Sequence, residues 1–318
     1  MRLFPVWSIV ISVIFLPKEG AFIMSDYVLT ASSTVDLTPE YLESIHVPFI
    51  CFHYELGGKA YLDDLWTSMD PHTFYQRMLD GEESRTSQIN ITEYIEFWRP
   101  FLKEGKDILH LTLSSGISGT VNSARAAAEE LRKEYPAREV LVVDSLAASS
   151  GFGLLVDKLA EKRDEGYSLK DLYHYAEENK LHLHHWFFST DLTFYIRGGR
   201  VSKTAGFFGR MLNICPLLNV DYQGRLIPRD KVRTKKKVIR ETVARMEEHA
   251  LNGADYDEKV FISYSDCLED AQAVAALVEA KFPKTKGRVQ LFPIGSTIGA
   301  HTGPGTVALF FWGDLRNN

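Results

Sequence analysis

The segment from Ser114 to Thr120 has the strongest local pattern for binding a ligand. It joins an apolar run, expected as a strand, to a run expected as a helix, where free backbone N–H groups favour an anion. The hydroxyls of Ser114, Ser115 and Ser118 would add donors, and Gly119 would let a ligand approach closely. Alternatively, Ser118 or Thr120 merely caps the helix. The loop is not a Walker A motif, because no Gly-Lys-Ser/Thr ends it.

Two further segments carry hydrogen-bonding side chains. His301 precedes a turn containing Gly303 and Gly305 around a proline, which would hold its imidazole in a fixed position. A neutral imidazole donates one hydrogen bond and a charged one donates two. Thr86, in the sequence Thr-Ser-Gln, offers a hydroxyl in an expected loop. Alone, both signals are weak, since a single loop histidine is usually structural or solvated and such tripeptides are common.

Two basic segments have the composition to meet an acidic partner. Arg200 ends the sequence Arg-Gly-Gly-Arg, and Arg233 lies in the basic cluster 231–237 at an expected strand-to-helix junction. A solvated surface is the simpler interpretation of each segment, and docking of an acidic partner is the functional one.

Several catalytic and cofactor motifs are absent from the sequence. It contains no Gly-x-Ser-x-Gly elbow, HExxH, calcium loop or dinucleotide fingerprint. The cysteines Cys51, Cys215 and Cys267 are far apart and odd in number, so neither a disulfide framework nor a zinc site is expected. A reducing, cytoplasmic location is therefore the default. We expect no metal, no cofactor and no catalytic residue.

Composition narrows the class of protein further. The chain has 318 residues, enough for two domains that each bury a core, with 45% hydrophobic and 25% charged residues. Its net charge of -6 argues against nucleic acid as the main partner, because phosphate binding needs a concentrated basic surface.

Residues 1–23 differ from the rest of the sequence. Arg2 precedes an apolar run that resembles the first part of a signal peptide, but no small-x-small cleavage site follows. The run is also short for a membrane span of about 20 residues. Because Met24 directly precedes the first expected strand, we expect it to be the true start and 1–23 to lie outside the fold. A secretion or anchoring signal is the alternative.

Apolar runs alternate with helical patterns in the first half of the chain. Strands are expected over 26–31, 47–52, 107–113 and 140–145. Helices are expected over 92–103, from Thr120 and from Ala147. Continuous apolar strands separated by helices indicate a mainly parallel sheet with helices on both faces.

The second half shows a more mixed pattern. Helices are expected over 169–179, 236–251 and 268–282, and strands over 185–190, 215–221, 226–232, 260–264, 289–294 and 306–312. The residues 222–225 between two of these strands indicate a hairpin. We expect an α/β fold with an N-terminal domain over 24–165 and a C-terminal α/β domain over 166–318 containing a mixed or antiparallel sheet.

The order of the motifs resembles the DegV family. In sequence they are Thr-Ala-Ser-Ser-Thr-Val-Asp-Leu (30–37), Thr-Ser-Gln (86–88), Leu-Ser-Ser-Gly-Ile-Ser-Gly-Thr (113–120), Val-Asp-Ser (143–145), Arg-Gly-Gly-Arg-Val-Ser (197–202), Leu-Asn-Ile-Cys-Pro-Leu-Leu (212–218), Lys-Val-Arg-Thr (231–234) and His-Thr-Gly-Pro-Gly (301–305). Each motif is modest, but eight of them in this order are specific. The resemblance runs from about Met24 to the C-terminus.

The resemblance implies a two-domain DegV-like (EDD) fold that holds one long-chain fatty acid in a tunnel, as the lipid-binding subunit of a bacterial fatty acid kinase. Carried over from the family, the carboxylate contacts are Thr86, Ser115 and His301, with Ser114 as the alternative serine and Ser118, Gly119, Gly303 and Gly305 in support. Arg200 and Arg233 would engage the kinase subunit that binds ATP. Transient contact with a membrane is also expected of such a carrier.

Some residues depart from the family pattern, and two alternative functions stay open. Ile89 stands where proline is common, and Cys215 stands where lysine is usual. An enzyme, a hydrolase or small-molecule phosphotransferase using Ser115 with His301, is one alternative. A lipid-sensing regulatory protein is the other. No third member of a catalytic triad is evident in the sequence, which disfavours the enzyme.

Overall fold

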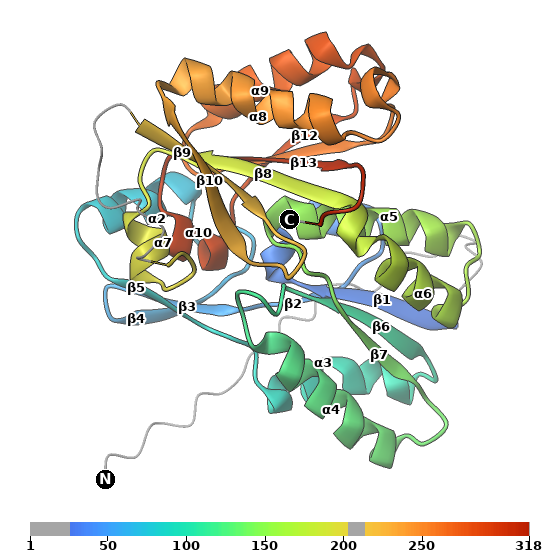
Figure 1. Ribbon diagram of the computed structural model, residues 1–318. Coiled ribbons are helices and arrows are strands. Elements are labelled where there is room, and N and C mark those ends of the chain that lie inside the picture. The colour runs from blue at the N-terminus through green and yellow to red at the C-terminus, as the bar shows by residue number, and fades with distance from the viewer. Residues whose placement is uncertain (1–25, 203–213, 318) are drawn as a thin grey trace.

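The computed structural model describes residues 26–202 and 214–317, so the expected leader over 1–23 lies outside the described residues (Figure 1). Four parallel strands form the N-terminal sheet in the order β2-β1-β6-β7. Their bounds are β1 Tyr27–Ser32, β2 Phe49–Ile50, β6 Asp107–Thr112 and β7 Val140–Asp144. The expected parallel sheet is confirmed.

A second sheet has six strands in the order β10-β9-β8-β13-β11-β12. Their bounds are β8 Leu183–Ser189, β9 Ile214–Val220, β10 Leu226–Arg233, β11 Val260–Tyr264, β12 Val289–Pro293 and β13 Thr306–Trp312. The sheet is mixed, because β11 and β12 pair in parallel and the other neighbours are antiparallel. A small antiparallel sheet completes the set, with β3 His53–Leu56 between β4 Lys59–Leu62 and β5 Ser84–Ser87.

Helices cover both large sheets and fill the space between them. Their bounds are α1 Pro39–Ser44, α2 Pro71–Leu79, α3 Ile91–Lys103, α4 Thr120–Glu134, α5 Ser149–Asp164, α6 Leu169–Asn179, α7 Thr193–Arg197, α8 Lys235–His249, α9 Leu268–Lys281 and α10 Ser296–Thr302. Helices α3 and α4 lie on the outer face of the four-stranded sheet, and α8 and α9 lie on the outer face of the six-stranded sheet (Figure 1). Helix α5 packs against β8, β11 and β13, so it joins the two sheets into one core.

Short-range chemistry explains several element boundaries. Thr38 caps α1, with its hydroxyl oxygen accepting a hydrogen bond from the Tyr41 N–H at 3.2 Å, and Pro39 is the first helical residue. The expected hairpin joins β9 to β10, and Gly224 adopts the positive φ of 72° that its turn requires. The helix expected over 169–179 is α6, with the same limits.

Three local expectations were wrong. Thr86 lies in strand β5 and not in a loop, because β5 is a polar strand that pairs with β3 and leaves no apolar alternation to detect. His301 lies in helix α10, whose close packing depends on Gly299, since a Cβ there would come within 2.5 Å of the Tyr75 hydroxyl. The strand expected over 47–52 pairs only through Phe49 and Ile50, because β2 is an edge strand.

The expected α/β fold class is confirmed by this arrangement. The boundary near residue 165 stays a prediction. Helix α5 comes before that boundary in sequence, yet it contacts the six-stranded sheet that follows the boundary.

Candidate functional site

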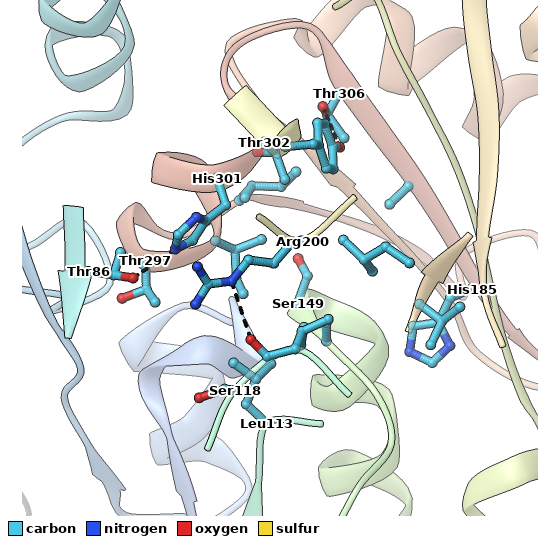
Figure 2. A pocket seen from close by; sticks show the side chains of 18 of the residues that line it. Thr86, Leu113, Ser118, Ser149, His185, Arg200, Thr297, His301, Thr302 and Thr306 are labelled. Atoms are coloured by element: carbon cyan, nitrogen blue, oxygen red, sulfur yellow. Dashed lines mark hydrogen bonds between the residues drawn. The ribbon is translucent and has the colours of Figure 1, made fainter. Parts of the chain in front are cut away.

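A cavity of about 390 Å³ lies where the sheets approach one another, within the volume range of small-molecule sites. Residues from β5, the loop before α4, α10 and the six-stranded sheet line it (Figure 2). Apolar side chains supply most of its inner wall, and they include Phe52, Leu113, Phe187, Val220, Leu226, Ala308 and Phe310.

One end of the cavity is polar. The Thr86 hydroxyl oxygen and His301 Nε2 are 2.7 Å apart, although the two residues are 215 positions apart in sequence. Strand β5 positions Thr86 through its pairing with Tyr54, and α10 positions His301. Figure 2 shows both side chains on the same side of the cavity, with His185 on the opposite side. The cavity therefore has hydrogen-bonding groups at one end.

The imidazole of His301 is neutral near pH 7. Burial, with a smaller contribution from the nearby Arg200 guanidinium, lowers its pKa to about 4. His301 Nδ1 has no hydrogen-bond partner among the described residues. A buried N–H without an acceptor is costly, so we assign the proton to Nε2, which donates to Thr86. The Thr86 hydroxyl then keeps its own hydrogen for a ligand anion.

The serine-rich loop places its hydroxyls unequally. Ser114 is fully buried outside the cavity lining, and its hydroxyl donates to the Gly224 carbonyl at 2.8 Å. Ser115 is exposed and also outside the lining, and its N–H donates to Asp144 at 3.0 Å. Ser118 and Gly119 do line the cavity. The role expected for Ser114 or Ser115 stays a prediction, and Ser118 is the serine of this loop that faces the Thr86–His301 end (Figure 2).

The glycines after His301 fix the end of α10. Gly303 and Gly305 have φ values of 67° and 83°, which favour glycine. A Cβ on Gly303 would meet the Phe194 ring at 2.2 Å, and a Cβ on Gly305 would meet the Thr190 hydroxyl at 2.4 Å. Neither glycine lines the cavity. Gly303 ends α10 two residues after His301, and the expected role of this turn in holding the imidazole stays a prediction.

The two candidate arginines lie in different environments. Arg200 lines the cavity beside His301, half-buried, and its Nε–H donates to the Ile117 carbonyl at 3.3 Å (Figure 2). Burial lowers the pKa of Arg200, but a guanidinium remains charged. Arg233 ends β10, is exposed and lies outside the cavity lining. Arg200 is therefore placed to interact with an anion in the cavity, and the partner-binding roles expected for Arg200 and Arg233 stay predictions.

Ser149 and Thr297 are among the cavity residues that sequence reasoning missed. Ser149 begins α5 with a φ of 55°, a strained value for a residue with a Cβ, and its hydroxyl donates to Asp36. Thr297 lies in the first turn of α10. The run Ala-Ala-Ser-Ser-Gly over 147–151, where α5 begins, indicated only a helix, so it did not identify the site.

A group of two histidines and a carboxylate lies elsewhere in the described structure. His184, His249 and Asp314 have ligand atoms within 4.8 Å of one another. However, the imidazole rings of His184 and His249 stack at 17°, so their in-plane lone pairs do not converge on one ion. His184 Nε2 also lies 2.9 Å from the Asp314 carbonyl. We interpret the group as a tie between the C-terminal residues, β8 and α8.

Comparison with known proteins agrees with this geometry. A sequence model described as an uncharacterised protein of the DegV family matches residues 28–314. A DegV domain-containing protein of Clostridium perfringens is 34% identical over 293 residues, which cover 92% of this chain and 99% of the relative. The resemblance drawn from the eight motifs is confirmed.

Solved structures share the fold. A DegV family protein from Thermus thermophilus, described for its fatty acid binding, is 28% identical with a TM-score of 0.78, covering 91% of this chain and 99% of that one. The Fatty Acid Kinase B3 protein of Streptococcus pneumoniae, loaded with linoleic acid, is 20% identical with a TM-score of 0.78, covering 92% and 100%. Among the described residues, no helix is long and apolar enough to cross a membrane.

Proposed function

The chain belongs to the DegV family, and on that premise we propose that it binds one long-chain fatty acid and presents its carboxylate to a separate ATP-dependent kinase. The acyl chain lies along the apolar wall of the cavity. The carboxylate lies at the end formed by Thr86, Ser118, Arg200 and His301. The observation that carries the proposal is a mainly apolar cavity with a pair of hydrogen-bonding side chains at one end.

The energies favour a fatty acid over a small polar ligand. Burying a chain of about 16 carbons at roughly 0.8 kcal/mol per methylene gives on the order of 12 kcal/mol before ordering costs. A carboxylate enters such a site only if donors replace its water. The Thr86 and Ser118 hydroxyls and the Arg200 guanidinium supply donors, and neutral His301 orients Thr86.

The kinase role explains why we assign no catalysis to this chain alone. The T. thermophilus and S. pneumoniae relatives are described by the fatty acids they bind. An enzyme using Ser115 with His301 gains no support, because Ser115 lies outside the cavity that His301 lines. The partner would supply ATP and its binding site, and the carrier would need no cofactor. We place the carrier and its kinase partner in the cytoplasm.

Native mass spectrometry of gently purified protein tests the binding. We expect one fatty acid of mass corresponding to a long chain to co-purify, and added palmitate or oleate to bind to protein stripped of lipid. A protein that emerges without lipid and then refuses both acids contradicts the proposal.

Arg233→Ala should separate presentation from binding. We expect fatty acid affinity to stay unchanged, because Arg233 is exposed and outside the cavity. Acyl phosphate formation with a bacterial fatty acid kinase subunit and ATP should fall at least about tenfold, as loss of a charge contact to a partner predicts. Arg132→Ala on exposed α4 is the matched control and should leave both quantities unchanged. An unaltered rate in the Arg233 variant removes this residue from the partner surface.

A further inference from the structure

Two carboxyl groups lie close together directly behind the cavity wall. Asp36 and Asp63 are each 1% exposed, although aspartate side chains usually lie at the protein surface. A Cβ on Gly295 would lie 2.5 Å from Asp36 Oδ1 and 3.4 Å from Asp63 Oδ1, so the two oxygens flank the same backbone atom. Among the described residues, neither carboxyl group has an ion pair with a lysine, arginine or histidine.

The two groups differ in their hydrogen bonds. Asp63 accepts from the Ser33 hydroxyl at 3.0 Å and from the Ser296 hydroxyl at 2.8 Å. Asp36 Oδ2 accepts from Ser149, whereas Asp36 Oδ1 has no side-chain partner in the described structure. Two buried like charges without a cation cannot both be ionised at low cost. The group with fewer donors is the one that keeps a proton.

We propose that Asp36 holds a proton in the folded protein and that the Asp36–Asp63 pair is a pH-sensitive latch between α5 and α10. The proton removes the charge repulsion between Asp36 and Asp63. Burial raises the pKa of Asp36 well above its ordinary value, and the Asp63 charge raises it further. The other titratable groups that interact with the pair are Tyr75 from α2, Cys51 after β2 and Tyr54 from β3. Burial raises the pKa of all three groups, so they stay neutral beside the pair.

The latch reaches the ligand cavity through its hydrogen-bond partners. Ser149 from α5 donates to Asp36, and Ser296 from α10 donates to Asp63. Ser149 and Thr297 both line the cavity, and α10 carries His301. Loss of the Asp36 proton would place two charges between α5 and α10 and displace the helix that holds His301. This part of the inference rests on the proposed fatty acid site.

The direction of the pH effect follows from the raised pKa. A carboxyl group whose pKa is higher in the folded than in the unfolded state contributes stability that is fully present below the unfolded value. That contribution is lost as the pH rises through the folded value. The latch is therefore closed at low pH and opens as the pH rises through the raised folded-state pKa of Asp36.

The test compares the wild type, Asp36→Asn and the exposed control Asp257→Asn between about pH 5, where an ordinary aspartate is already ionised, and about pH 10. Palmitate affinity and the free energy of unfolding are measured at each pH. We expect the palmitate affinity of the wild type and of the control to fall at least about tenfold. Above the folded-state pKa of Asp36, the release of one proton changes the latch equilibrium about tenfold for each pH unit. Asp36→Asn, which keeps a neutral group of the same shape, should lose that fall. A fall of the same size in Asp36→Asn overturns the latch.

Infrared spectroscopy of the wild type provides a second readout that needs no variant to fold and no ligand to bind. We expect the band of a protonated carboxylic acid to persist above about pH 5, where an ordinary aspartate is ionised, and to be lost as the pH rises further. Absence of that band above about pH 5 overturns the proposal. Failure of palmitate to bind at pH 7 would instead refute the proposed function, while the infrared band and the unfolding data still decide whether the latch exists.

Discussion

Combining Thr86→Val with His301→Phe should abolish tight fatty acid binding, raising the dissociation constant for palmitate by about 100-fold or more. Thr86 supplies a hydroxyl donor, and His301 fixes its direction through the 2.7 Å contact. A hydrogen bond to a charged group contributes about 1.5–3 kcal/mol, and the variant leaves a carboxylate beside two apolar groups. Each 1.4 kcal/mol corresponds to a tenfold change in the dissociation constant.

The two single variants should be strongly non-additive. Because His301 acts through Thr86, His301→Phe alone should reproduce much of the loss seen in the double variant. Thr92→Val, on the exposed face of α3, is the matched control and should bind palmitate like the wild type. Isothermal titration calorimetry with palmitate measures the wild type, the double variant, the two single variants and the control. Wild-type affinity in the double variant would place the carboxylate elsewhere.

Ala308→Leu should shorten the cavity and discriminate against long acyl chains. Strand β13 runs along the wall, and its alternate residues Thr306, Ala308 and Phe310 line the cavity. Phe310 pairs with His185, on the side opposite His301 in Figure 2, so Ala308 lies partway along the wall. A larger side chain there excludes two or three methylenes, which costs about 2 kcal/mol, or about thirtyfold in the dissociation constant.

Chain length provides the internal check on that prediction. A 10-carbon acid should bind the Ala308→Leu variant with much the same affinity as the wild type, while an 18-carbon acid shows the full loss. Ala276→Leu adds the same volume on the exposed face of α9 and should change neither. Equal losses for both acids would mean that the variant disturbs the fold rather than the length of the cavity.

The sequence predicted the large elements well because each follows a strong local rule. The apolar strands β1, β6 and β7 are continuous runs, as a sheet covered on both faces requires. The Thr38 cap and the turn at Gly224 depend on residues within a few positions of one another. Such features need no knowledge of the rest of the chain.

The candidate site was less predictable because tertiary contacts create it. Nothing near Thr86 indicates a strand, since β5 is stabilised by pairing with β3 rather than by its own apolar residues. The choice among Ser114, Ser115 and Ser118 depends on which hydroxyl is hydrogen-bonded to the β9–β10 turn. The Ser114 hydroxyl donates to the Gly224 carbonyl in that turn. Asp36 and Asp63 are ordinary surface residues by type, and only the fold brings them together behind the cavity.

A crystal structure of the protein with palmitate tests the central claim most directly. We expect the carboxylate within about 3.5 Å of the Thr86 hydroxyl, at the end of the cavity nearest His301, with the acyl chain extending past Ala308 toward Phe310. A chain in the reverse direction, with its carboxylate beside His185, would contradict the account, and so would palmitate bound outside the cavity.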